Sequence, residues 1–288
     1  MTKIFRRKRT WLIILLLLIA VPVIFGYVMM GEMNWSDKGI NDFFKDKSMK
    51  PQFNTYQAGG RSIYYASIGA DTLPMVLFIH GAPGSWTDYI KYFGDSNLVS
   101  RAHLVAMDRP GYGKSGTGKP VTSIAEQVEM IKPLLDLNKS KQPVILVAHS
   151  YGGPIAVRLA MDEKVKAMLL MAPQVDPEHE KQFAINKLAG LKMIQWVMPG
   201  TLLSAYYEKK THVDELKKLD PDWNKISTPT VYMFGEKDQI VPPANALYAK
   251  RKLTNATLEL IAFPNENHFI PWTQRDSVTK IILRLVEK

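Results

Sequence analysis

One serine in this chain stands where a hydroxyl group could become a nucleophile. Ser150 lies between an aliphatic run at residues 144–147 and a helical pattern at residues 154–161, within the segment AHSYGG. A serine at a tight strand-to-helix turn, with small residues two positions away on each side, is typical of a nucleophile elbow. Because the turn strains the backbone of Ser150, Ala148 and Gly152 must be small. The helix that follows directs its positive N-terminal end at the reaction centre.

A serine hydroxyl is a weak nucleophile until a base accepts its proton, so the chain must also supply a histidine and an acid. Residues 230–234 and 257–263 are predicted to be strands, with Asp238 in the loop after the first and His268 in the loop after the second. The carboxyl ends of parallel strands meet at the sheet edge where ligands bind. We therefore expect both side chains near Ser150, in the chain order Ser, Asp, His that this architecture uses.

Several sequence blocks in this order resemble those of one family. They are HGAPG at 80–84, DRPGYGKS at 108–115, AHSYGG at 148–153, GEKDQIVP at 235–242 and NENHF at 265–269. The chain thus resembles the α/β-hydrolase superfamily, in its lipase, esterase and epoxide-hydrolase-like branch, over about residues 53–288. The resemblance implies an α/β fold: a mostly parallel, doubly wound sheet with a small helical cap. Relatives that open epoxides or remove halide use an aspartate nucleophile, so a serine argues against those reactions.

The resemblance also implies a role for each candidate residue. Ser150 would attack a carbonyl carbon, with His268 as the general base and then the general acid, while Asp238 would hold the imidazole in its working tautomer. The backbone N–H groups of Ala82 and Tyr151 would form the oxyanion hole. Each such donor lowers the barrier by roughly 3–4 kcal/mol.

Some of these assignments have alternatives. Ser150 could be only a helix N-cap. Asp176 is the rival acid, because it follows an earlier predicted strand at residues 167–171 and some relatives place the acid there. The neighbouring polar residues are expected to serve packing, loop order or turn bracing: His80, Asp108, Arg109 and His149.

The remaining elements must position these residues. Residues 53–58 and 61–68 flank Gly59-Gly60 and are predicted to form a β-hairpin. Further predicted strands are 74–79 and 102–107, and predicted helices are 86–93 and 124–137, the second capped by Ser123.

The alternation of strands and helices is interrupted between residues 174 and 225, where relatives carry a cap over the active site. This stretch has helical spacing and many bulky apolar residues, with Pro199-Gly200 as a break. A cap excludes water and shapes the pocket. Hydrophobic esters or long acyl chains are therefore expected as substrates, rather than sugars or charged peptides.

The chain begins with a second informative feature, an uncharged apolar run at residues 11–30. As a helix it would be about 30 Å long, the thickness of a bilayer core. Five basic residues precede it, which favours a cytoplasmic N-terminus and an extracytoplasmic remainder. We expect a cytoplasmic tail at 1–10, a transmembrane signal anchor at 11–30, a solvated juxtamembrane linker at 31–52 and a hydrolase domain at 53–288. A cleaved signal peptide is the alternative, although no small-x-small cleavage site follows the run.

Composition narrows the function further. The net charge of +10 has half its excess in the N-terminal tail and the rest dispersed, so we expect no nucleic-acid partner. The absence of cysteine excludes disulfides and thiol chemistry. No metal motif is recognised, and the expected chemistry needs no cofactor.

The sequence therefore predicts a membrane-anchored serine hydrolase, a carboxylesterase or lipase-like enzyme. Its predicted partners are a small-molecule ester and the lipid bilayer. Alternatives within the enzymes are a proline-type aminopeptidase, a carbon–carbon bond hydrolase and a cofactor-free haloperoxidase. A catalytically silent binding module is the alternative from another class.

Overall fold

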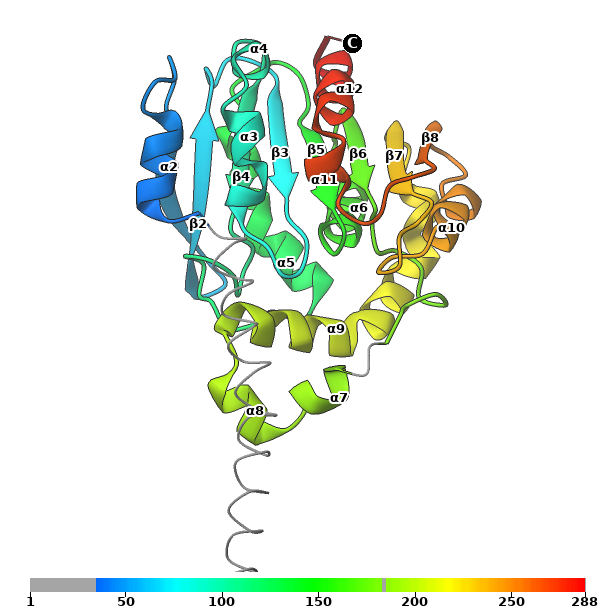
Figure 1. Ribbon diagram of the computed structural model, residues 1–288. Coiled ribbons are helices and arrows are strands. Elements are labelled where there is room, and N and C mark those ends of the chain that lie inside the picture. Colours follow the sequence, from blue (N-terminus) through cyan, green and yellow to red (C-terminus); the bar gives the residue numbers. More distant parts are fainter. Residues whose placement is uncertain (1–34, 183–184, 288) are drawn as a thin grey trace, which may run out of the picture.

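The computed structural model describes residues 35–182 and 185–287. An eight-stranded sheet forms its centre, with the strand order β1-β2-β4-β3-β5-β6-β7-β8 (Figure 1). The β1–β2 and β2–β4 pairs are antiparallel and all later neighbours are parallel. The strands are β1 Gln52–Ala58, β2 Arg61–Ile68, β3 Met75–Ile79, β4 His103–Met107, β5 Ile145–His149, β6 Ala167–Met171, β7 Thr230–Gly235 and β8 Leu258–Phe263.

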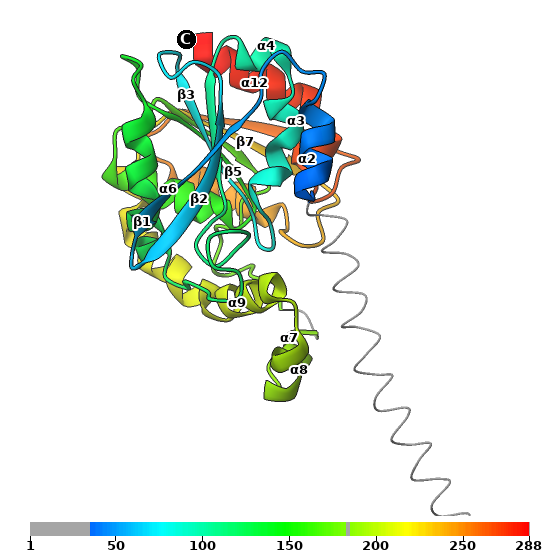
Figure 2. The ribbon, with the colours of Figure 1, turned by 90° about the vertical axis from the view of Figure 1, so that its left-hand side faces the viewer.

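The central strands are apolar on both faces because helices cover both. Every residue of β3, β4, β5 and β6 is buried. This continuous apolar pattern is typical of parallel strands in a doubly wound sheet. Figure 2 shows α6 on one face of the sheet, with α2, α3, α4 and α12 on the other. These helices span Gly152–Asp162, Asp37–Phe44, Ile90–Phe93, Ser96–Val99 and Arg275–Glu287, respectively.

The predicted helix at residues 124–137 changes geometry in its middle. Helix α5 covers Ile124–Ile131, and a 3-10 helix, Lys132–Leu137, follows it. Pro133 has no N–H for an α-helical bond, which accounts for the change at this point. The Ser123 hydroxyl accepts a hydrogen bond of 3.3 Å from the Glu126 N–H, as predicted for a cap. The predicted helix at 86–93 is likewise a 3-10 turn, Trp86–Tyr89, followed by α3.

The expectation of a solvated linker at residues 31–52 is wrong for the middle of that segment. Residues Asp37–Phe44 form α2, and Ile40 and Phe44 are buried against the core. The two apolar residues are four positions apart and therefore share one face of the helix. The folded unit thus begins before the hairpin rather than at residue 53.

The cap is inserted between β6 and β7, in the region where the sequence predicted it. It consists of α7 (Ile185–Ala189), α8 (Lys192–Val197), α9 (Gly200–Leu219) and a 3-10 helix (Asp220–Lys225). Figure 1 shows α7, α8 and α9 together at one end of the molecule, below the sheet. Two short elements complete the fold, α10 (Ala244–Lys252) and α11 (Ile270–Thr273).

The predicted transmembrane segment, residues 11–30, lies outside the residues that the structure describes. Across 35–182 and 185–287, no helix combines the length and apolar character needed to span a bilayer.

Candidate active site

Ser150 occupies a strained turn between β5 and α6. Its φ angle is +51°, in the left-handed region that non-glycine residues rarely adopt. A Cβ atom on Gly152 would lie 2.3 Å from the carbonyl oxygen of Ile79, and one on Gly153 would lie 2.3 Å from the Cβ of Pro173. Both positions therefore require glycine for the helix to start this close to the sheet. The strained turn presents Ser150 to a mostly apolar pocket.

His268 and Asp238 form a buried pair beside this turn. The His268 Nδ1 atom lies 2.7 Å from the Asp238 Oδ2 atom. The other carboxylate oxygen, Oδ1, accepts hydrogen bonds of 2.8 Å from the N–H groups of Ile240 and Val241. Because Nδ1 donates to the carboxylate, the neutral ring leaves Nε2 as a proton acceptor. Ser150 and His268 line the same pocket.

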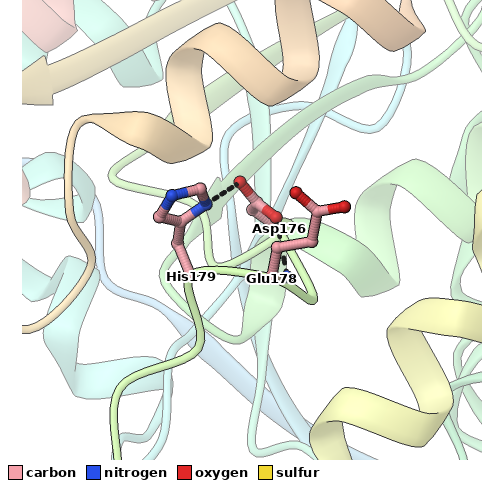
Figure 3. Close-up of side chains that lie close together, drawn as sticks. All are labelled: Asp176, Glu178 and His179. Carbon is pink, nitrogen blue, oxygen red and sulfur yellow. Dashed lines mark hydrogen bonds and ion pairs between the residues drawn. The ribbon is translucent and has the colours of Figure 1, made fainter.

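Asp176, the alternative acid, has other partners. Its Oδ2 atom lies 2.8 Å from the Nδ1 atom of His179, and its Oδ1 atom accepts a 2.8 Å hydrogen bond from the Glu178 N–H (Figure 3). The Asp176 N–H donates to the Asn245 side chain at 2.8 Å. These bonds brace the loop after β6 and leave Asp238 as the acid paired with His268.

Asp176, Glu178 and His179 also place possible metal-ligand atoms within 4.8 Å of one another. In Figure 3 the Glu178 carboxylate does not join the contact between the other two side chains. Both Asp176 oxygens already accept hydrogen bonds inside the protein. The hydrogen bonds of Asp176 explain this cluster as a feature that stabilises the loop after β6, and we assign no metal to it.

The predicted oxyanion loop lies against the nucleophile. A Cβ atom on Gly81 would lie 3.0 Å from the Ser150 Cβ, so the backbone passes directly over the serine. Ala82 and Tyr151 line the same pocket as Ser150. Within the described residues, neither the Ala82 N–H nor the Tyr151 N–H donates a hydrogen bond to a backbone group outside helices and strands. Both groups are thus free of such a backbone acceptor, as the predicted oxyanion hole requires.

Arg109 holds the start of this loop. Its Nε and Nη2 atoms donate hydrogen bonds of 2.9 Å to the carbonyl oxygens of His80 and Gly81, respectively. Its backbone N–H donates to His80 Nε2 at 2.8 Å, so the proton of the neutral His80 ring is on Nδ1, 2.7 Å from the Gly81 oxygen. Burial, followed by the nearby Arg109 charge, holds the pKa of His80 well below its ordinary value. His80 therefore stays neutral and orders the loop.

The charge of Arg109 is balanced by Glu208 on cap helix α9, a partner that the sequence did not suggest. The two side chains are fully buried, and their Nη1–Oε1 and Nη2–Oε2 distances are 2.7 and 3.0 Å. Burial alone would lower the pKa of Arg109, but the Glu208 carboxylate outweighs it and raises the pKa above its ordinary value. The Glu208 carboxylate also accepts hydrogen bonds from Tyr112 Oη at 2.5 Å and from Gln127 Nε2 at 2.8 Å. The only sequence signal was an acid within an apolar helical stretch.

Arg109 also contacts the second arm of the predicted oxyanion hole. Its guanidinium carbon lies 4.9 Å from the centre of the Tyr151 ring. The ring of His212, from α9, lies 4.5 Å from the same Tyr151 ring. One arginine therefore touches the loop that carries Ala82 and the residue that follows Ser150. The cap contacts Arg109 through Glu208 and Tyr151 through His212.

Asp108 and His149 have structural partners as well. Asp108 accepts hydrogen bonds from the N–H groups of Trp86 at 2.9 Å and Lys114 at 2.8 Å, which ties two loops together. His149 Nε2 lies 3.0 Å from the His268 carbonyl oxygen. Burial, with the neighbouring His268 ring, lowers the pKa of His149 to about 3, so it is neutral and unsuited to act as a base near neutral pH.

The pocket in front of Ser150 has a volume of about 420 Å³ and mostly apolar walls. Met198, Leu202 and Tyr206 from the cap face it, together with Phe269 and Trp272 from the core. Among the described lining residues there is no aspartate or glutamate, and Lys209 is the one lysine or arginine. The pocket thus suits an apolar group with a neutral reacting centre.

Comparisons with known proteins agree with this architecture. The family model described as alpha/beta hydrolase fold matches residues 74–193. The chain is 22% identical over 280 residues to the proline iminopeptidase PfmaB of Pestalotiopsis fici, covering 81% of this chain and 98% of that protein. It is 23% identical over 261 residues to the monoacylglycerol lipase abhd6-B of Xenopus laevis, covering 74% of this chain and 75% of the relative. Epoxide hydrolases and an esterase are further relatives.

A solved structure shares the fold at low identity. The monoacylglycerol lipase of Paleococcus ferrophilus superimposes with a TM-score of 0.60 at 19% identity, covering 78% of this chain and 98% of that one. The likeness at this identity concerns the fold. The reaction has to be argued from the site itself.

Proposed function

With membership of the α/β-hydrolase superfamily supported by the family match and the fold, we propose that this chain is a serine hydrolase that cleaves hydrophobic carboxylic esters. The observation that carries the proposal is that His268, which is paired with buried Asp238, lines the same apolar pocket as the strained Ser150. A triad of this kind is recognised by geometry and by the role of each group.

The geometry supports a two-step reaction. His268 Nε2 accepts the Ser150 proton as the serine oxygen bonds to the ester carbonyl carbon. The negative charge that develops on the carbonyl oxygen is stabilised by the N–H groups of Ala82 and Tyr151. As the tetrahedral intermediate collapses, the bond to the alcohol breaks and His268 returns the proton to the leaving oxygen. Water then repeats the sequence on the acyl-enzyme, releasing the acid and free Ser150.

Pocket charge favours an ester over a peptide with a free amino terminus, the substrate type of the aminopeptidase alternative. A substrate ammonium group needs an unpaired carboxylate near the scissile bond. Two glutamates with buried side chains in and beside the cap are already paired, Glu208 with Arg109 and Glu180 with Lys209 and His212. The described pocket lining itself contains no aspartate or glutamate. An uncharged ester fits this lining without an unpaired charge.

We also propose that residues 11–30 anchor the enzyme as a single-pass protein with the catalytic domain on the extracytoplasmic side. The support is the uncharged apolar run and the five basic residues before it. Anchoring would hold the site near esters that partition into the bilayer.

A substrate panel tests the reaction. Purified protein is assayed on p-nitrophenyl esters of increasing acyl length, on matched anilides, and on a proline anilide with a free amino group. We expect turnover of the esters, rising with acyl length, and labelling of Ser150 by a fluorophosphonate probe. Cleavage of the proline anilide alone would identify an aminopeptidase, and the absence of both turnover and labelling would identify a silent module.

The topology is tested separately with protease added to spheroplasts from expressing bacteria. The domain should be digested while a cytoplasmic marker survives. Protection of the domain would place it in the cytoplasm, and a shortened, freely soluble product would indicate a cleaved segment.

A further inference from the structure

The cap carries an exposed apolar surface formed by residues that do not line the pocket. Four large side chains form it, with exposed fractions of 53%, 52%, 63% and 86%: Leu188, Leu191, Met193 and Trp196. We define these four residues as the cap tip. They belong to α7, α8 and the turn between them, at the end of the molecule farthest from α4 (Figure 1). An exposed apolar cluster of this kind marks an interaction surface.

Helix α8 has one face toward the protein and one away from it. The Gln195 side chain donates to the Ala189 carbonyl oxygen at 3.0 Å and accepts from Tyr207 Oη at 3.0 Å, which fixes that face against α7 and α9. Met193 and Trp196 are three positions apart, one helical turn on the other face. No residue of α8 is buried. The contacts of Gln195 therefore leave Met193 and Trp196 exposed on the opposite face of α8.

The charges around the cap tip suit an anionic surface. Lys187 and Lys192 are exposed next to Leu188 and Leu191. From residue 181 to residue 207 the chain contains three lysines and neither aspartate nor glutamate. Lysines that border exposed leucine and tryptophan are typical of segments that lie in the headgroup region of a bilayer.

The start of the folded unit lies beside the N-terminal end of cap helix α9, the element that follows the cap tip in the chain. Trp35 and Thr201 line the same groove. Thr201 is the second residue of α9, which begins three residues after the end of α8. Trp35 is five residues beyond Met30, the end of the apolar run. Five residues of extended chain reach at most about 18 Å. A bilayer that held the anchor would thus be within reach of this end of the cap.

From these observations we propose that the cap tip docks on a lipid bilayer carrying anionic headgroups, with Trp196 and Met193 inserted at its surface. Two cap residues that line the pocket come soon after α8: Met198 follows it directly, and Leu202 lies in the first turn of α9. An ester in the bilayer would then reach Ser150 by a short apolar path. The docking does not depend on the reaction proposed above, whereas this consequence for substrate entry rests on it.

The absence of cysteine from the chain allows a direct test. A single cysteine at Leu191→Cys carries an environment-sensitive fluorophore, in full-length protein reconstituted into phosphatidylcholine vesicles with or without phosphatidylglycerol. Ser100→Cys is the matched control, because Ser100 is exposed at the end of α4. Both labelled proteins have the same N-terminal segment, so tethering affects them equally.

We expect the label at position 191 to shift to shorter wavelength and to be quenched by brominated lipid, more strongly with phosphatidylglycerol, while the label at position 100 does neither. Equal signals at the two positions would overturn the proposal. A label at 191 that is shielded without vesicles, in proportion to protein concentration, would overturn it in favour of a second copy of the chain. A signal indifferent to phosphatidylglycerol would overturn the role given to Lys187 and Lys192.

An activity measurement tests the consequence for substrate entry. The variant Met193→Ser/Trp196→Ser should hydrolyse a soluble short-chain ester at the wild-type rate and a long-chain ester embedded in vesicles about 10-fold more slowly. Equal losses on both substrates would contradict a role in docking. If neither protein hydrolyses any ester, the proposed reaction fails, and the fluorescence result still decides the docking.

Discussion

Arg109 and Glu208, which are 99 residues apart in the chain, form a buried two-point ion pair with distances of 2.7 and 3.0 Å. Glu208 belongs to the cap and Arg109 to the core loop that binds the carbonyl oxygens of His80 and Gly81. The arginine is therefore a positioning residue for the predicted oxyanion hole. Its counterion comes from the element that also covers the pocket.

The first prediction concerns the nucleophile and the base. Ser150→Ala and His268→Ala should each abolish ester turnover, and the loss in the double variant should be no larger than in either single variant, because the groups act as a unit. Ser150→Ala should also prevent fluorophosphonate labelling. Circular dichroism checks that the fold is intact. Turnover retained by folded Ser150→Ala would refute the mechanism.

The second prediction separates the two candidate acids. Asp238→Asn should lower kcat on the order of 10⁴-fold, because an amide does not hold the imidazole in the tautomer that accepts the serine proton. Asp176→Asn is the matched control and should change kcat little, since its carboxylate binds His179 and the Glu178 N–H. Steady-state kinetics on a soluble ester measures both. The reverse ranking would assign the acid to the loop after β6.

The third prediction concerns the ion pair. Arg109→Met and Glu208→Leu should each lower the free energy of unfolding by about 3–5 kcal/mol, because each leaves one buried charge without its partner. The double variant should regain most of that loss, since neither charge then remains. Denaturant unfolding of the three variants measures the coupling.

Activity of the same double variant tests the positioning role. Without the arginine donors to His80 and Gly81, kcat should stay about 10–100-fold below wild type, with KM nearly unchanged. A stable double variant with full kcat would show that the pair serves stability alone.

In the unfolding experiment, the pairing itself would be contradicted if the loss of unfolding free energy in the double variant equalled the sum of the losses in the two single variants.

The fourth prediction concerns Asp88, which lies next to the oxyanion loop. Burial, and secondarily the nearby Asp108 carboxylate, raises the pKa of Asp88 from 3.8 to about 8. The unfolded chain then loses this proton near its ordinary pKa while the folded chain keeps it until about pH 8, so stability should fall as pH rises through this window. Asp88→Asn should remove that part of the slope. Unfolding free energies between about pH 5 and pH 8 measure it, with exposed Asp136→Asn as the control. Equal slopes for wild type and Asp88→Asn would contradict the raised pKa.

Local features of the site could be read from the sequence because short-range physics produces them. An apolar run that stops at AHSYGG can form little other than a strand, a tight turn and a helix, and Ser150 indeed has a φ angle of +51°. Strand ends likewise indicated that Asp238 and His268 lie at one edge of the sheet. These inferences need only the period of the pattern and the size of the side chains.

Other features depended on which distant segments became neighbours. Asp176 and Asp238 both follow strands, and the sheet order decides between them: β7 pairs with β8, so the loop of Asp238 adjoins the loop of His268. The packing of α2 on the core and the Arg109–Glu208 pair also depend on contacts between segments that are far apart in the sequence. The sequence indicates that a hydrophobic or charged residue needs a partner if it is to be buried. Which residue becomes that partner is set by how the sheet and the cap pack in three dimensions.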